Sequence, residues 1–344
     1  KGAASLRASD LHLMTGEMPV VRIDGKLRAM VGEPPADVEA LLGPRLATEA
    51  ERRMASGASA DLGFGVEGVG RCRLNVYKTA LGLAAAVRIL PANAPTLAEL
   101  RHPVALEELV DLPHGLVLVC GPTGSGKSST LAALAQEALL RRSIMLITLE
   151  DPIEHVLTSK GPKGLVRQRQ VGTHVRDFAT GLRDALREDP DILLIGEMRD
   201  AETISLALTA AETGHLVLAS LHSRSAASAV ERIIDVYPPE RQAQIRVQLA
   251  EALRAVVAQR LLVHAKGEGR IPAVEVLRGT SAVANAIREA KTSTLTNAMQ
   301  AGKKEGMVPL ERCLADLVLK RLVGYEEARS VANDLGALTS YLSG

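Results

Sequence analysis

The sequence predicts an α/β protein whose central sheet is mostly parallel. The middle of the chain holds four short, unbroken apolar runs, at residues 116–120, 144–149, 192–195 and 216–219. Unbroken runs are typical of strands that are buried on both faces, as the strands of a parallel sheet are. Stretches of helical periodicity such as 127–140 and 201–211 separate the runs, and they are long enough for crossover helices. A glycine-rich segment directly after the first run is a third indication, because such loops join strand to helix in phosphate-binding α/β folds.

The composition indicates a folded chain of about two domains. Its 344 residues are 47% hydrophobic, and domains usually have roughly 100–200 residues each. Forty-one Lys and Arg against forty Asp and Glu give a net charge of +1, which points to neither nucleic acid nor an anionic membrane. The three cysteines form no C-x-x-C pair, which argues against a zinc site and favours a reducing cytoplasm. No apolar run approaches the roughly 20 residues of a membrane helix, so the chain is expected not to be integral to the membrane.

The amino-terminal part, residues 1–92, is predicted to form a smaller α+β domain. Strand-like runs at 20–23 and 26–31 flank the dipeptide Asp24-Gly25. That dipeptide is favoured in two-residue hairpin turns, because both turn positions take positive φ. The runs are therefore expected to pair as a hairpin.

A proline-rich linker at residues 93–103 is expected to lead into the parallel-sheet core at 104–279. A helical region at 280–344 is expected to end the chain. From about residue 240 the pattern predicts helices at 241–262, 282–291 and 310–321, with one strand at 271–277.

A phosphate-binding loop is predicted at residues 121–128, which read GPTGSGKS and match G-x-x-x-x-G-K-[ST] at every position. Successive backbone N–H groups would face one phosphate, Lys127 would reach the β and γ phosphates, and the Ser128 hydroxyl would ligate Mg²⁺. The residues expected to bind the nucleotide are Pro122, Thr123, Gly124, Ser125, Gly126, Lys127, Ser128 and Ser129. An ordinary glycine-rich turn is the alternative, but it gives no reason for Lys and Ser to follow the glycines.

Two acidic clusters follow predicted core strands at their carboxyl ends, where parallel sheets bind ligands. Glu150 opens EDPIE after residues 144–149, and Glu197 lies in GEMRD after 191–195. Hydrolysis needs carboxylates on the metal side that orient water, so both are candidates to act near Mg²⁺ without ligating it directly. A solvated strand-end carboxylate is the alternative for Glu197, and a simple Asp-Pro turn is the alternative for the Glu150 cluster.

Two histidines, His215 and His222, flank the fourth core strand in the sequence GHLVLASLH. A histidine at a strand end near phosphate can sense or bond the γ phosphate. A satisfied structural donor is an equally good interpretation on the residues alone.

These segments together resemble a known family. GPTGSGKS, EDPIE, ALREDPDILLIGEMRD and TAAETGHLVLASLHS follow in the order of the Walker A, Asp, Walker B and His boxes of the secretion ATPase superfamily. Within it, the chain is most similar to the twitching-motility retraction ATPases of the PilT type, over nearly its whole length. The resemblance implies a RecA-like core that binds ATP and Mg²⁺, a PAS-like amino-terminal domain, and a homohexameric ring.

The resemblance also assigns roles to single residues. Glu197 would be the catalytic carboxylate, Glu150 would help to place water or Mg²⁺, and the histidines match the His box. The segment GRCRLNVYKTALGLAAAVRIL is similar to the strand pair that carries arginine fingers, which makes Arg73 and Arg88 the candidates and Arg71 a third. Guanidinium groups suit the charge of a transferring phosphoryl group, while ordinary surface arginines are the alternative.

Two features bear on which branch of the superfamily the chain resembles. Assembly and export members usually carry a four-cysteine zinc loop, and the corresponding interval 262–272 holds no cysteine here, so no zinc is expected. Retraction members carry a helix written AIRNLIRE; this chain has AVANAIRE at 282–289, with Ala284 where an arginine is usual. A plain amphipathic packing helix is the alternative interpretation of that segment.

The expected function is therefore ATP hydrolysis by a hexameric motor for type IV pilus retraction, working in the cytoplasm against an inner-membrane platform protein. A pilus-assembly or type II secretion ATPase is the first alternative. A DNA-translocating or DNA-transfer ATPase is the second, but aromatic residues are only 2% of the chain, which leaves few platforms for base stacking. No nucleic acid is expected as a partner.

Overall fold

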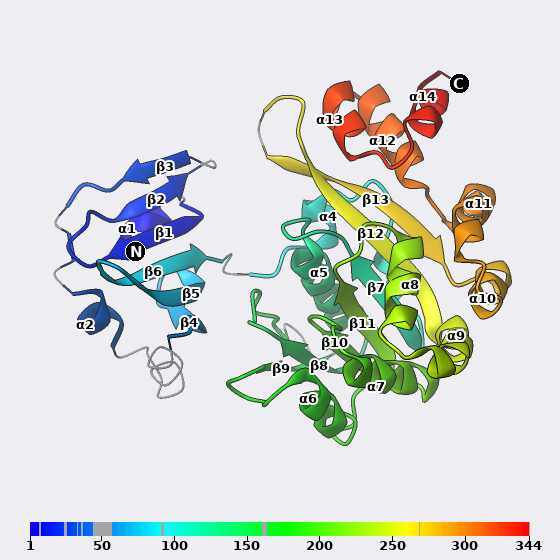
Figure 1. Cartoon of the computed structure of the whole chain (residues 1–344), viewed down its shortest axis with the longest axis horizontal. Coiled ribbons are helices and arrows are strands. Elements are labelled where there is room, and N and C mark those ends of the chain that lie inside the picture. Colours follow the sequence, from blue (N-terminus) through cyan, green and yellow to red (C-terminus); the bar gives the residue numbers. More distant parts are fainter. Residues whose placement is uncertain are drawn as a thin grey trace. The chain divides into compact units, whose positions relative to one another are not determined.

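A computed structural model describes the chain except residues 7, 24–25, 33, 36, 44–56, 91–92, 160–163, 268 and 344. The described chain divides into two compact units, each with its own sheet (Figure 1). The first unit comprises Lys1–Ala94 and Pro152–Val156, and the second comprises Pro95–Asp151 and Leu157–Gly344. The short segment 152–156 thus groups with a unit that lies far from it in sequence, which no sequence pattern indicated.

The first unit is a six-stranded antiparallel sheet in the order β3-β2-β1-β6-β5-β4. Its strands are β1 (Asp10–Met14), β2 (Val20–Ile23), β3 (Lys26–Ala29), β4 (Ala60–Val66), β5 (Gly70–Thr79) and β6 (Gly82–Ile89). Two short helices accompany them, α1 (Gly2–Ser5) and α2 (Val38–Leu42). The strands β2 and β3 pair as the predicted hairpin, although its turn at Asp24-Gly25 lies outside the described residues.

The second unit is built on a seven-stranded sheet in the order β13-β12-β7-β11-β10-β8-β9. Its strands are β7 (Gly115–Cys120), β8 (Met145–Glu150), β9 (Leu165–Gln170), β10 (Ile192–Ile195), β11 (Leu216–Leu221), β12 (Leu253–Val263) and β13 (Arg270–Arg278). All neighbours are parallel except β12 and β13. The predicted α/β class and the four parallel core strands are confirmed.

Helices pack against this sheet and continue beyond it (Figure 1). The helices before β12 are α4 (Leu97–Leu100), η2 (Glu107–Val110), α5 (Lys127–Arg141), α6 (Phe178–Ala185), α7 (Ala201–Glu212), α8 (Ala226–Asp235) and α9 (Pro239–Ala252). After β13 come α10 (Ser281–Arg288), η3 (Thr292–Thr294), α11 (Leu295–Ala301), η4 (Gly302–Glu305), α12 (Leu310–Leu319), α13 (Tyr325–Val331) and α14 (Leu335–Ser343). The predicted carboxy-terminal helical region is present.

One predicted helix is wrong in part. The sequence predicted a single helix over 241–262, but the chain leaves α9 at Ala252 and forms β12 directly afterwards. The segment AVVAQRLLV is almost wholly buried between β7 and β13, and a short apolar run of this kind fits a buried strand as well as a helix. Pairing with β7 and β13 makes this segment a strand rather than a helix.

The core of the second unit lies on both faces of the parallel strands. Every residue of β7, β10 and β11 is buried, as strands covered on both faces require. All three cysteines of the chain, Cys72, Cys120 and Cys313, are buried thiols. Among the described helices none combines the length and apolar character needed to cross a bilayer.

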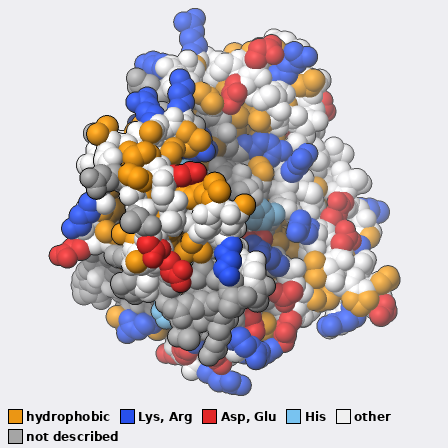
Figure 2. Space-filling model, turned by 60° about the vertical axis from the view of Figure 1, so that its left-hand side comes forward, with side chains coloured by type: hydrophobic (Ala, Val, Ile, Leu, Met, Phe, Trp, Pro, Cys, Tyr) orange, Lys and Arg blue, Asp and Glu red, His pale blue; other side chains and the backbone are white. Residues whose placement is uncertain are grey.

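The surface carries charges of both signs. On the face shown in Figure 2, Lys and Arg side chains alternate with Asp and Glu side chains, with no large area of one sign. This distribution matches the near-zero net charge of the chain.

Candidate functional site

The predicted phosphate-binding loop joins β7 to α5 at the carboxyl edge of the parallel strands. It begins at Gly121, whose N–H donates to the Leu221 carbonyl of β11 at 3.3 Å. Gly124 and Gly126 have φ values of +77° and +89°, which residues with a Cβ rarely adopt. The chain can therefore curl back on itself before it enters the helix, as the motif predicts.

The amino end of α5 leaves backbone donors for a ligand. Helices α6, α7 and α8 begin with an Asp or Ser side chain that accepts from the first turn. Helix α5 begins after Gly126, and no described side chain caps it. Ser125 adds a hydroxyl that is buried and has no hydrogen-bond partner within the described residues. Uncapped N–H groups at a helix start bind anions, so the loop suits a phosphate.

Lys127 lies with its ammonium group over the start of the loop. Its Nζ donates to the carbonyls of Gly121 at 2.9 Å and Pro122 at 3.0 Å. Charged phosphate oxygens are stronger acceptors than neutral carbonyls. A phosphate in the loop would therefore draw the ammonium group toward itself.

A buried glutamine on β12 holds the phosphate-binding loop through hydrogen bonds. Gln259 is 2% exposed; its Nε2 donates to the Ser125 carbonyl at 2.6 Å, and its Oε1 accepts from the Thr130 hydroxyl at 2.8 Å. A Cβ at Gly126 would lie 2.7 Å from the same Nε2, and φ there is +89°, so both the contact and the backbone favour glycine. His102 extends this series of hydrogen bonds, with its Nε2 3.1 Å from the Thr130 hydroxyl. Burial lowers the pKa of His102 to about 4.

Sequence reasoning did not identify this support. Gln259 lies 134 residues from Ser125 along the chain, inside a segment predicted as helix. The one available signal was the polar side chain of Gln259 within a long apolar run. Such a residue indicates a contact only when the neighbouring strand is known.

Glu197 and His222 meet at the carboxyl ends of the adjacent strands β10 and β11. His222 Nε2 lies 3.3 Å from Glu197 Oε1, and Arg199 Nη2 donates to Glu197 Oε2 at 2.6 Å. The Ser220 hydroxyl donates to the Gly196 carbonyl at 2.5 Å, which fixes the turn that carries the carboxylate. A carboxylate with both oxygens engaged is held in one orientation.

The charges around Glu197 keep it ionised. Burial raises its pKa, but the hydrogen bond from Arg199 and the positive charges of His222, when that residue is protonated, of Arg199 and of Lys127 together lower it below its usual value. Burial lowers the pKa of His222, and Lys127 lowers it further, while Glu197 opposes the shift. Near pH 7, a neutral imidazole thus faces a carboxylate, and because the carboxylate can only accept, Nε2 carries the proton.

Glu150 lies on the next strand, at the end of β8. Its Oε1 accepts from the Thr148 hydroxyl at 2.6 Å and from Gln168 Nε2 at 3.0 Å. Gly196 lies beside it: its N–H donates to the Leu149 carbonyl at 2.7 Å, and a Cβ there would be 3.2 Å from the Glu150 Cα. Each acidic cluster thus follows the carboxyl end of a core strand, as the sequence predicted, and the structure adds that the two strands are neighbours.

The structure does not bring His215 into this group. His215 precedes β11, and Nδ1 lies 3.0 Å from the Ala210 carbonyl. His222 follows the same strand, so six residues at about 3.3 Å each, roughly 20 Å, separate the two ends. His215 thus lies at the opposite edge of the sheet with the contacts of a structural residue, and its predicted role at the phosphate stays a prediction.

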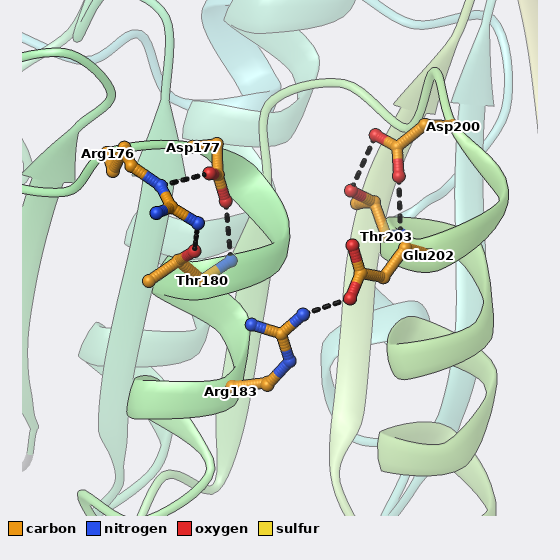
Figure 3. A network of polar contacts seen from close by, with 7 residues as sticks. All are labelled: Arg176, Asp177, Thr180, Arg183, Asp200, Glu202 and Thr203. Atoms are coloured by element: carbon orange, nitrogen blue, oxygen red, sulfur yellow. Dashed lines mark hydrogen bonds and ion pairs between the residues drawn. The ribbon is translucent and has the colours of Figure 1, made fainter.

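Asp200 has a local role too (Figure 3). Its carboxylate caps α7, accepting from the backbone N–H and the hydroxyl of Thr203, each at 2.8 Å. In the same first turn of α7, Glu202 pairs with Arg183 of α6, which joins the two helices. These contacts fix the helix that begins just after Glu197.

The three candidate arginines belong to the first unit. Arg73 and Arg88 are cross-strand partners on β5 and β6, and Arg71 is on β5. Arg73 pairs with Asp61 at 3.4 Å, and Arg88 pairs with Asp10 at 2.9 Å. Their predicted role as fingers stays a prediction.

A divalent metal would have few protein ligands here. Within the described residues, no three His, Cys, Asp or Glu side chains are grouped so that they could hold a metal ion. The exposed Ser128 at the start of α5 has the hydroxyl that phosphate-bound Mg²⁺ uses in such loops. The donor set therefore fits an ion that arrives with a nucleotide.

Comparison with known proteins finds similar proteins over nearly the whole chain. The family model for type II/IV secretion system proteins matches residues 1–305. The chain is 44% identical over 333 residues to the type IV pilus retraction ATPase PilT of Pseudomonas aeruginosa, covering 96% of each chain. It is 39% identical to a twitching motility protein of Neisseria gonorrhoeae, covering 96% of this chain and 90% of that one. A crystal structure of the pilus retraction motor PilT with bound ADP superposes with a TM-score of 0.90 at 39% identity, covering 98% and 97% of the two chains.

Proposed function

Because the chain belongs to the type II/IV secretion system protein family, we propose that it is an ATPase motor that retracts type IV pili. The observation that carries the proposal is the near full-length similarity to a retraction ATPase, together with a complete phosphate loop beside an oriented carboxylate. The similarity to a motor with bound ADP supports nucleotide binding.

The loop from Pro122 to Ser129 would hold the phosphates of ATP. The uncapped start of α5 and the Ser125 hydroxyl supply neutral donors, and Lys127 supplies a charge for the β and γ phosphates. Ser128 would ligate Mg²⁺, with Glu150 and Glu197 acting on its water ligands. When bound, Mg²⁺ neutralises the charge of the phosphate oxygens.

Glu197 would then orient the water that attacks the γ phosphate. Its two oxygens are fixed by Arg199 and His222, but a carboxylate has about four acceptor sites and can still accept from a water. His222 would hold the carboxylate in place and lie next to the transferred phosphoryl group. This arrangement assigns the chemistry to groups at the carboxyl ends of four neighbouring strands, β7, β11, β10 and β8.

We extend the proposal to the assembly. Family members are typically hexamers, and we propose that this chain forms a homohexamer in which Arg73 and Arg88 reach a nucleotide. A platform protein of the inner membrane would be its partner, and the ring would work at the cytoplasmic side of the pilus base. On binding nucleotide, the guanidinium groups of Arg73 and Arg88 would leave their partners Asp61 and Asp10 and bind phosphate oxygens instead.

The first experiment separates hydrolysis from binding. Glu197→Gln should lower kcat for ATP hydrolysis about 100-fold or more, the usual contribution of a catalytic acid or base, with the Kd for ADP unchanged within about twofold. Glu202→Gln is the matched control, because it removes an exposed carboxylate that pairs only with Arg183 among the contacts described. Wild-type turnover in Glu197→Gln would refute the assignment.

A cellular experiment tests the direction of the motor. Loss of a retraction motor should leave cells with excess surface pili that cannot twitch, whereas loss of an assembly motor should leave them bare. Bare cells would replace the proposed function by the assembly alternative.

A further inference from the structure

Two adjacent polar residues of β12 serve opposite faces of the sheet. Gln259 contacts the phosphate loop, as described above. Arg260 follows it, and since successive strand residues point to opposite faces, its side chain lies on the other side. Arg260 is 9% exposed, and burial lowers the pKa of its guanidinium group. A buried guanidinium group needs acceptors, and it finds them in two segments that are far apart in sequence.

The first acceptor belongs to the loop that carries His222, which we call the histidine loop (residues 222–226). Arg260 Nη1 donates to the Arg224 carbonyl at 2.9 Å. Glu275, on the neighbouring strand β13, accepts from the Ala226 N–H at 2.6 Å. Two buried ionisable side chains therefore hold the backbone of the histidine loop, just beyond the residue that contacts Glu197.

The other acceptors belong to the carboxy-terminal turn, defined as residues 331–334 between α13 and α14. Arg260 Nε donates to the Val331 carbonyl at 3.2 Å, and Nη2 donates to Asn333 Oδ1 at 3.0 Å. The turn is fixed a second time by Glu311 of α12, whose Oε1 accepts from the N–H groups of Asn333 and Asp334 at 2.9 and 3.1 Å. A planar guanidinium group holds its acceptors in a fixed fork, so the turn and the histidine loop are held in one arrangement.

We propose that Arg260 is a positioning residue that sets the histidine loop and makes turnover depend on the carboxy-terminal turn. The inference rests on the proposed ATPase function, since it assigns a controller to the same site. A displacement of the turn would move the guanidinium group, then the Arg224 carbonyl, and with it the 3.3 Å contact between His222 and Glu197. The same displacement would change the affinity of the site for nucleotide, and by linkage nucleotide binding would change the stability of the turn.

The variant Asn333→Ala tests the dependence on the turn. It removes one side-chain acceptor of Arg260 and leaves the backbone bonds from the turn to Glu311 in place. We expect kcat for ATP to fall about tenfold, the factor that corresponds to one charge-assisted hydrogen bond, and the Kd for ADP to change by at least about twofold, because linkage ties nucleotide affinity to the turn. Asn333→Asp keeps an acceptor and should recover most of kcat. Arg329→Ala is the matched control and should behave as wild type, because among the contacts of the described residues it breaks an exposed pair with Glu326 on α13.

Amide hydrogen exchange tests the reverse effect without hydrolysis. Adding ADP and Mg²⁺ to wild type should change exchange in residues 331–335, and Arg260→Met should abolish that change while ADP still binds. A wild-type kcat in Asn333→Ala, a fall that Asn333→Asp does not recover, or exchange in the turn that ignores ADP would each overturn the proposal. If wild type binds ADP with the exchange response but does not hydrolyse ATP, the proposed function fails and the coupling stands.

Discussion

Replacing Gln259 by leucine should lower both the stability of the second unit and its affinity for nucleotide. The change keeps the volume but removes the donor to the Ser125 carbonyl and the acceptor for the Thr130 hydroxyl. An unpaired buried carbonyl costs about 1–3 kcal/mol. The hydroxyl keeps its contact with His102 at 3.1 Å, so its loss is smaller, about 1 kcal/mol. The free energy of unfolding should therefore fall by about 2–4 kcal/mol.

The same change should raise the Kd for ADP about tenfold, because an unsupported loop must be ordered when phosphate binds. Calorimetric titration gives the Kd, and urea unfolding followed by circular dichroism gives the stability of the second unit. Thr130→Val is the matched control: it removes the hydroxyl but leaves the bond from Gln259 to the loop. It should cost at least about 1–3 kcal/mol of stability, because Gln259 Oε1 and His102 Nε2 lose their partner, with the Kd within about twofold of wild type. A Gln259→Leu protein with wild-type affinity, or a Thr130→Val protein with equally weak binding, would refute the support role.

Three further predictions concern the same unit. Gly126→Ala should abolish nucleotide binding in calorimetry, because a Cβ would meet Gln259 Nε2 at 2.7 Å and φ is +89°; retained affinity would contradict the geometry. His222→Asn should lower kcat about tenfold or more in a phosphate-release assay, whereas His215→Asn, its matched control, should leave kcat within about twofold; equal losses would show that our separation of the two histidines is wrong. Burial raises the pKa of Glu275 from 4.5 to about 7, so between these values the folded state holds a proton that the unfolded state has lost, and stability should fall as the pH rises from 4.5 to 7. Glu275→Gln should flatten that part of the stability curve measured by urea unfolding, and an unchanged slope would show that another group causes it.

The parts of the site that short patterns encode could be predicted from the sequence. The phosphate loop is contiguous, and Glu197 follows a run of apolar residues that is buried on both faces in the structure. Each of these signals lies within about ten residues, so neighbours in the chain are also neighbours in space.

The rest depends on contacts between distant segments. Gln259 meets Ser125 only because β12 inserts between β7 and β13, and an apolar run of that kind is compatible with helix or strand. The positions of His215 and His222 look alike in the sequence, since each borders a strand. Only the direction of that strand relative to β7 shows that one lies at the ligand edge and the other at the opposite edge.

The buried thiols make the chain convenient for site-specific labelling. Burial raises the pKa of Cys313 to about 11 and that of Cys120 further, so neither forms the reactive thiolate near pH 7. Cys72 is likewise enclosed. A single new cysteine on an exposed position could therefore carry a maleimide fluorophore with little background, and the native protein would need no cysteine-free version. Motions of the proposed ring could then be followed in real time on an otherwise unaltered polypeptide.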